Sequence, residues 1–369
     1  MTAQPFHRAQ ADMLGERPPP PRTVGTIGWM RANLFSNWFN TGLTLVSLYL
    51  LWLIVPGVLD WAFFTADFAG EDRFACTSSG ACWAWVDQRI KLFLYGFYPI
   101  DQIWRVNLAL ILLAPALAPL LFDKMPGARY LRWFSLAYPI IATFLLIGGL
   151  GLEKVPTSKF GGFMLNITIG LAGIVLSLPF GIMLALGRRS KLPIMRIFSV
   201  AFIEILRGVP LITLLFVAAI LLPIFLPEGF SLDLVVRVIV VVTAFSSAYM
   251  AEVIRGGLQG IPQGQYEAAQ AMGLKYWQMM GLIILPQALK ISIPGIVNTF
   301  IGLFKDTTLV IVIGLFDILN IGNSMVSNPK WLGLSTEAYV FISLFFFLVC
   351  FSMSRYSALL EKRLDTTNG

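Results

Sequence analysis

Apolar residues fall along this chain in long blocks that are separated by short polar stretches. Most blocks are close to the ~20 residues that a helix needs to cross the hydrocarbon layer of a bilayer. The fourth and the seventh are longer, and tilt or a break is expected in them. The pattern predicts an all-α, polytopic membrane protein with about eight transmembrane helices, at about 41–64, 106–122, 133–152, 161–187, 208–226, 234–254, 288–316 and 334–353.

The composition excludes an ordinary soluble domain. Of the 369 residues, 57% are hydrophobic and 13% are charged, whereas soluble chains carry roughly 25% charged residues. The first apolar block begins only near Thr41, which is too late for a cleaved signal peptide. Residues 1–40 contain the stiff run Pro18–Pro21 and are predicted to form a flexible cytoplasmic tail.

The lysines and arginines predict the orientation of the spans. If the N-terminus lies inside, 18 of the 27 Lys and Arg residues fall in inner segments and 7 fall in outer segments. Cytoplasmic loops carry such an excess, so both termini are expected to be cytoplasmic. The formal net charge of +7 is then a signal of topology and does not indicate a nucleic-acid partner.

Few side chains suggest metal or covalent chemistry. His7 is the single histidine and the three cysteines are scattered, so neither a metal site nor a catalytic group is expected. Cys76 and Cys82 share the first outer loop. In an oxidising compartment they would close a small disulfide loop, and the alternative is two free thiols.

Several recognisable motifs lie close together in the sequence after residue 160. They are IEILRGVPL at 203–211, AYMAEVIRGG at 248–257, IPQGQYEAA at 261–269, LPQAL at 285–289 and KDTTL at 305–309. From 160 to about 328 the chain resembles the amino-acid (histidine/glutamine type) subfamily of ABC-importer permeases. The resemblance is greatest to the M-type subunits of general L-amino-acid permeases.

The resemblance implies a division of the chain. Residues 160–357 would form the five-helix type I permease core, with an EAA coupling loop at 255–287. Residues 41–159, with three spans and a long periplasmic loop, would be an added block, and 358–369 a cytoplasmic tail. The protein would be a multi-pass protein of the bacterial inner membrane.

The coupling loop has a readable local design. Residues 265–272 are rich in alanine and favour a helix, and Gly273 suits a helix end that needs positive φ. A second helix is predicted from Lys275 to Leu285, with Pro286 as a break before the seventh span. The resemblance implies that this projection docks into an ATPase, and the coupling residues would be Gln265, Glu267, Ala268, Ala269, Gly273, Leu285 and Pro286.

The chain contains no G-x-x-x-x-G-K-[ST] motif, so it holds no nucleotide cofactor in the P-loop manner. ATP and Mg would be bound by a partner ATPase. One coupling loop per chain and two ATPase copies imply a second permease chain, which the M-type resemblance suggests is a related paralogue in a heterodimer. A periplasmic amino-acid-binding protein would deliver the L-amino-acid substrate.

Charged residues near or inside the spans are the candidates for the substrate path or gate. Lys305, Asp306 and Thr307 interrupt the seventh block, where they would contact substrate or form a mutual or interchain salt bridge. The other candidates are two pairs at i,i+3 spacing, which could brace an inner gate. They are Glu204 with Arg207, and Glu252 with Arg255.

Three other functions are alternatives to an amino-acid importer. The first is an ABC-importer permease for another small polar solute. The second is an ion- or proton-driven secondary transporter, which predicts intramembrane carboxylates paired across inverted halves. The third is a receptor that borrowed the fold. No internal repeat of this kind is visible in the sequence.

Overall fold

The computed structural model describes residues 25–122, 127–227, 229 and 231–364, and these residues form helices with no β-strand among them. Residues 1–24 of the predicted tail lie outside the described residues. The part of the tail from Gly25 onward includes a helix. The elements, with η for 3-10 and π helices, are α1 (Gly25–Asn33), α2 (Trp38–Leu59), η1 (Asp60–Phe64), η2 (Arg73–Ala75), α3 (Ala84–Tyr95), η3 (Ile100–Gln102), α4 (Ile103–Leu121), α5 (Ala128–Ile147), η4 (Thr157–Lys159), α6 (Gly162–Arg188), α7 (Pro193–Gly208), α8 (Leu211–Phe216), η5 (Val217–Leu221), α9 (Leu222–Phe225), α10 (Leu234–Gln259), α11 (Gln263–Ala271), α12 (Tyr276–Met279), η6 (Met280–Ile284), α13 (Leu285–Asp306), η7 (Thr307–Ile313), α14 (Ile318–Val326), η8 (Pro329–Trp331) and α15 (Ser335–Leu364).

The chain divides into two compact units. The first comprises Met1–Asp67 and Thr77–Ala81, and the second comprises Phe68–Cys76 and Cys82–Gly369. In the first unit, Asn37 caps the start of α2 by accepting a hydrogen bond from the backbone N–H of Asn40 at 2.8 Å. This cap satisfies one of the donors that a helix start leaves without a partner.

The prediction of about eight spans is confirmed. Among the described residues, seven helices are long and apolar enough to cross a membrane, and the count is eight if one bent pair is a single span. In that pair α7 meets the run Leu211–Phe225 at an angle of 103°. The fifth predicted span is therefore short, and an amphipathic helix, α7, precedes it.

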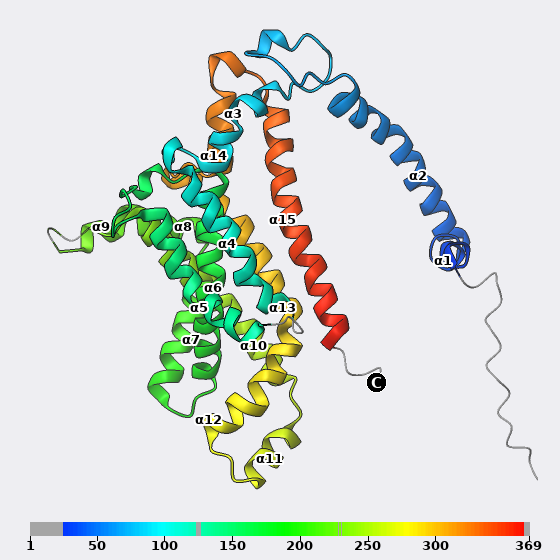
Figure 1. The fold of residues 1–369 in the computed structure, drawn as a ribbon. Helices are drawn as coiled ribbons and strands as arrows, with labels where there is room; N and C mark the ends of the chain where they lie inside the picture. The colour runs from blue at the N-terminus through cyan, green and yellow to red at the C-terminus, as the bar shows by residue number, and fades with distance from the viewer. Residues whose placement is uncertain (1–24, 123–126, 228, 230, 365–369) are drawn as a thin grey trace, which may run out of the picture. The chain divides into compact units, whose positions relative to one another are not determined.

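The core of the second unit is built around α10, which packs along α6 and against α13 (Figure 1). Small residues permit this close approach. A Cβ on Gly181 of α6 would lie 2.6 Å from Met250 Cγ, and one on Gly257 of α10 would lie 2.4 Å from the Ala288 carbonyl oxygen of α13. A larger side chain at either position would push the helices apart.

Helices α4 and α5 share an apolar core with α6, α8 and α10, across the domain boundary predicted at residue 159. A fully buried arginine, Arg105 of α4, joins the ends of this pair. Its Nε donates to the Leu145 carbonyl at 2.7 Å, and Nη1 donates to the Glu153 carbonyl at 2.9 Å. Leu145 lies in the last turn of α5, whose carbonyls have no partner within the helix.

Replacing this arginine should destabilise the second unit. Arg105→Met leaves the buried Leu145 carbonyl without a donor and removes the bond to the Glu153 carbonyl, which should cost about 2–4 kcal/mol of unfolding free energy. Denaturant unfolding of the detergent-purified protein, followed by tryptophan fluorescence, measures this loss. Arg132→Met is the control, because Arg132 is exposed and donates to Ala128 of its own helix. Equal midpoints for the two variants would contradict the assignment.

The predicted break at Pro286 is wrong. Helical structure continues without interruption through α12, η6 and α13, and the candidate span runs over Tyr276–Ile313. A π-helical turn, η6, directly precedes α13, and Pro286 occupies the first turn of α13. Proline has no N–H to donate, and its ring crowds the preceding carbonyls. The wider π-helical turn changes the hydrogen-bond pattern at this point, so the helix continues through the proline.

Candidate functional site

The loop between α10 and α13 forms a projection at one end of the second unit, opposite the end that carries α3 and α14 (Figure 1). It consists of α11, a turn at Gly273 and α12. Gly273 has φ +74°, a value that side chains rarely tolerate, and its N–H donates to the Gln270 carbonyl at 2.9 Å. The glycine therefore closes α11 and sets the direction in which α12 leaves.

The two alanines of the loop face opposite ways. Ala269 is buried against Met279, Met280 and the end of α10, whereas Ala268 is exposed. Ala269 thus anchors α11 to the body of the protein. The outer surface of the projection combines one carboxylate with large apolar groups, which are the exposed side chains of Glu267, Met272, Tyr276 and Trp277. Such a surface is typical of a site that binds another protein.

The root of the projection is tied to α13 as well as to α10. Gln287 of α13 donates from Nε2 to Gln265 Oε1 at 3.3 Å and to the Ile283 carbonyl at 2.9 Å. Leu285 is half-buried against the same apolar cluster as Ala269. The loop is therefore attached to the ends of both helices.

Four charged side chains predicted as two local pairs instead share one network. Glu252 of α10 bonds Arg255 at 2.8 Å, as its spacing predicts, and also lies 3.5 Å from Arg207 of α7. Its other oxygen accepts from Arg188 of α6 at 2.8 Å. The pairing of Glu204 with Arg207 is wrong, because Glu204 bonds Arg188 at 2.9 Å.

Arg188 was missed from the sequence because its two carboxylates lie 16 and 64 residues away. In the sequence, Arg188 is part of a basic run at the end of a span, and such a run is equally typical of a solvated inner loop. In the folded chain it holds the C-terminal end of α6 to both α7 and α10. Glu252 is the centre of the network, since it meets three arginines.

Lys305 and Asp306 close the last turn of α13, where the α-helix passes into the 3-10 helix η7. Lys305 is exposed and Asp306 is half-buried. Within the described part of the chain neither residue forms an ion pair, so the predicted mutual salt bridge is absent there. Both charges are thus available to a group outside this chain.

Thr307 is placed differently from its two neighbours. It is fully buried, donates to the Phe304 carbonyl at 2.7 Å and accepts from Asn166 Nδ2 of α6 at 3.0 Å. Asn166 also accepts from the Ile318 N–H at 3.0 Å, next to buried Asp317, which caps α14. Burial raises the pKa of the Asp317 carboxyl to about 6. This polar cluster fastens η7 and α14 to α6, and its contacts come from residues too distant in sequence to predict.

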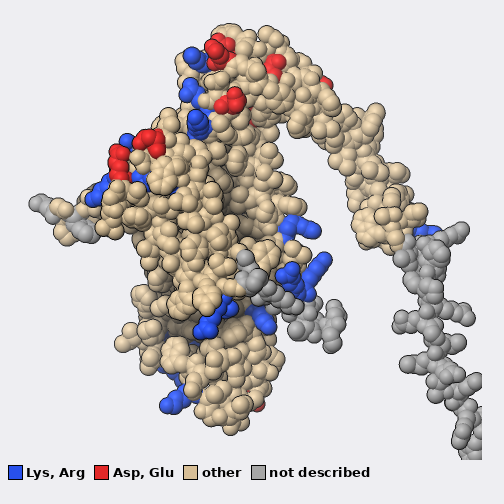
Figure 2. Space-filling model, viewed as in Figure 1, with Lys and Arg blue, Asp and Glu red and all other residues tan. Residues whose placement is uncertain are grey.

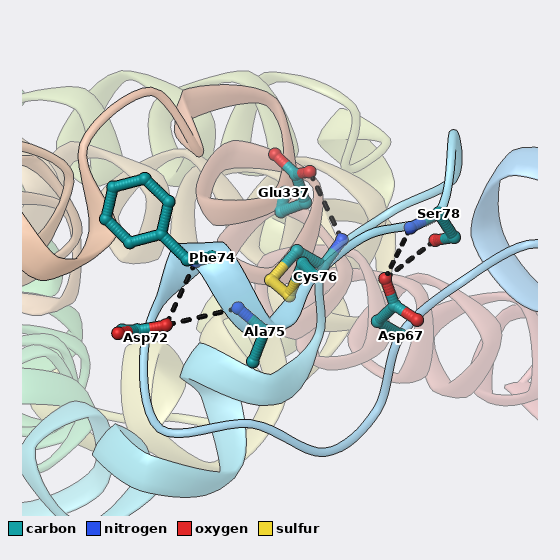
Figure 3. The surroundings of a disulfide bond; sticks show 8 residues. Asp67, Asp72, Phe74, Ala75, Cys76, Ser78 and Glu337 are labelled. Carbon is teal, nitrogen blue, oxygen red and sulfur yellow. Dashed lines mark hydrogen bonds between the residues drawn. A yellow bond between two sulfur atoms is a disulfide. The ribbon is translucent and has the colours of Figure 1, made fainter.

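Cys76 and Cys82 are joined by a disulfide, which resolves the alternative left open by the sequence (Figure 3). Residues on either side of the closed loop contact the α14–α15 connection and the start of α15. The Arg73 guanidinium donates to the Leu332 carbonyl at 2.7 Å, and the Cys82 N–H donates to Glu337 Oε1 at 3.3 Å. Arg73 and Cys82 therefore hold the segments that flank the disulfide against the start of α15 and the turn before it.

The disulfide predicts a count of thiols. Denatured without a reductant, the protein should accept one maleimide tag, on Cys350, and after reduction it should accept three. Cys350→Ser should shift these counts to none and two. The double variant Cys76→Ser/Cys82→Ser should lose about 2 kcal/mol of stability, because a short unfolded loop is no longer constrained. Three tags before reduction would contradict the bridge.

Charge is distributed unequally over the second unit. On the face seen in Figure 2, most of the acidic residues lie toward the end with α3 and α14, and the charged residues toward the opposite end are mostly Lys and Arg. The projection of α11 and α12 lies at this basic end.

Known proteins resemble the chain over most of its length. Residues 177–366 match the family described as binding-protein-dependent transport system inner membrane component. The chain is 50% identical to the inner membrane amino-acid ABC transporter permease protein YhdY of Escherichia coli (strain K12), over 95% of this chain and 96% of that protein. It is 45% identical to the glutamate/glutamine/aspartate/asparagine transport system permease protein BztC of Rhodobacter capsulatus, over 96% and 97% of the two chains.

Other similar proteins match about half of the chain. The probable glutamine ABC transporter permease protein GlnP of Bacillus subtilis (strain 168) is 34% identical, over 55% of this chain and 91% of its own length. A crystal structure of an amino acid ABC transporter with histidines covers 54% of this chain and 91% of its own, with 27% identity and a TM-score of 0.48.

Proposed function

The chain belongs to the family of binding-protein-dependent transport system inner membrane components, and on this premise we propose that it is the permease subunit of an ATP-driven importer of L-amino acids. The substrate class is supported by the two relatives that match it nearly end to end, both of which are named as amino-acid transport permeases. The motifs around Arg207 and Lys305 agree with the same substrate class.

The observation that carries the proposal is the projection of α11 and α12. It is compact, anchored by Ala269, and presents Glu267 beside exposed Met272 and Trp277. A permease subunit is not itself catalytic, so this surface is where a separate ATPase, with its ATP and Mg, would dock. Closure of two ATPases on ATP would then push two such projections together.

One projection per chain requires a second permease chain, which we propose to be a related paralogue. Each chain would supply half of the translocation path. The basic end of the second unit (Figure 2), which carries the coupling loop, would face the cytoplasm. The charge count of the sequence would place both termini on the cytoplasmic side as well. A periplasmic amino-acid-binding protein would deliver substrate at the opposite end.

Lys305 and Asp306 are proposed to face this path. A zwitterionic amino acid needs both an anionic and a cationic partner, and the two side chains supply them without forming an ion pair within the described residues of the chain. Ionisable residues inside membrane spans are rare and mark substrate or ion paths, which supports this placement.

Reconstitution tests the function. The chain is purified with its co-isolated partner subunits, inserted into proteoliposomes with the binding protein outside, and offered labelled L-amino acids. Uptake should require ATP inside the vesicles and should not respond to a proton or sodium gradient. Gradient-driven uptake without ATP would identify a secondary transporter, and uptake of sugars or metals in place of amino acids would overturn the substrate class.

A further inference from the structure

Two adjacent arginines at the end of α6 contact two different parts of the proposed machinery. Arg188 donates to Glu204 of α7 and Glu252 of α10, at 2.9 and 2.8 Å. Arg189, the next residue, donates to the Tyr266 hydroxyl of α11 at 3.2 Å. One helix end thus contacts both the charged network and the projection.

Tyr266 immediately precedes the exposed Glu267, but it points inward and is half-buried. Its hydroxyl donates to the Leu258 carbonyl at 3.3 Å, and the Arg189 guanidinium donates to the same carbonyl at 3.2 Å. The guanidinium carbon also lies 5.7 Å from the centre of the tyrosine ring. The three groups therefore form a closed triangle between α6, α10 and α11.

The position of the Leu258 carbonyl explains why these donors gather there. It lies in the last turn of α10, where carbonyls have no partner within the helix and the helix dipole places negative charge. A cation and a hydroxyl both satisfy it. Arg189 is the C-cap residue of α6 and directly follows Arg188, so its bond to Tyr266 links α11 to the end of α6 that holds Arg188.

We infer, on the basis of the proposed function, that Tyr266 and Arg189 are positioning residues that transmit the motion of the coupling loop to the Arg188–Glu204–Glu252 network. They touch neither substrate nor nucleotide. When the ATPase moves α11, the triangle carries the end of α6 along, and the bonds from Arg188 to α7 and α10 rearrange. The ion-pair network is thereby the part of the inner gate that rearranges when the coupling loop moves.

Residues that only stabilise the local structure would make the same contacts. The test therefore needs a readout that a change in stability alone does not alter. This readout is the ratio of ATPase activity stimulated by loaded binding protein to basal ATPase activity, together with the amino acid taken up per ATP. Tyr266→Phe keeps the ring and removes the hydroxyl. Arg189→Gln removes the charge, and Arg189→Lys restores a cationic donor.

In proteoliposomes holding the whole complex, Tyr266→Phe and Arg189→Gln should each lower the stimulated-to-basal ratio about fivefold, the lower end of typical coupling between sites. The double variant should be no worse than either single variant, because the residues act as a unit. Arg189→Lys should recover part of the ratio. Tyr130→Phe, which changes an exposed tyrosine of α5 outside the projection and the charged network, is the matched control and should leave the ratio unchanged.

An unchanged ratio in Tyr266→Phe and Arg189→Gln would overturn the inference, and so would losses in the double variant that simply add. Failure of the inference is distinguishable from failure of the proposed function. If the unmodified complex takes up amino acids with ATP but the variants couple normally, the inference alone is wrong. If the unmodified complex shows no ATP-dependent uptake, the proposed function is wrong.

Discussion

The substitution Gly273→Val is expected to lower ATP-driven uptake at least about tenfold while the complex still assembles, since a misplacement of about 1 Å can cost on the order of 100-fold. Gly273 has φ +74°, and the left-handed region costs an L-residue roughly 1–2 kcal/mol. A β-branched valine is among the least tolerant residues there. The turn would escape the strain by changing the angle between α11 and α12, which misplaces the docking surface.

The origin of this effect is conformational, because a Cβ on Gly273 would meet no atom of the described residues within 4 Å, its two chain neighbours aside. Gly281→Val is therefore a matched control, since Gly281 is equally open but lies in helical backbone at ordinary φ. Uptake and co-purification of the ATPase are measured for both variants. Normal uptake in Gly273→Val, or an equal loss in Gly281→Val, would contradict the proposed coupling role.

Local sequence rules were sufficient wherever the determining contacts were local. The spans follow from long apolar blocks, and helix α11 with its glycine end follows from alanine content and one glycine. The pairing of Arg255 with Glu252 is predictable because the two residues are three positions apart on one helix. Such features depend on bonds within one or two turns, which the order of residues states directly.

Most of the features that the sequence did not predict depend on contacts between residues far apart in the chain. Glu204 was paired with Arg207 because both lie on one helix face, but Arg188 on a neighbouring helix is the residue that reaches it. Asn166 was not singled out, because its partners lie 141 to 152 residues away. Pro286 was treated as a helix break because the π-helical turn that accommodates it has no recognised sequence signal. Function was more predictable than this geometry, because the motifs of the coupling loop are local.

Neutralising the charges at the end of α13 is the second large effect that we expect. Asp306→Asn and Lys305→Met should each raise the KM for uptake roughly 10- to 100-fold, the equivalent of losing a hydrogen bond to a charged group worth about 1.5–3 kcal/mol. A charge within a membrane span costs about 2.5–3.5 kcal/mol unless it has a partner. Neither residue has an ion-pair partner in the described part of the chain.

The competing explanation is a salt bridge to the second permease chain, and the experiment separates the two. If the charges meet the substrate, the variants keep the partner chain through purification and lose affinity in uptake. If they pair across the interface, Asp306→Asn loses the partner chain, and that result would contradict the substrate role. Lys290→Met is the control for Lys305→Met, because it removes an exposed lysine from the same helix. Asp306→Asn is isosteric and changes the charge with almost no change in shape. A raised KM while the two permease chains still purify together would therefore assign the Asp306 carboxylate to the translocation path.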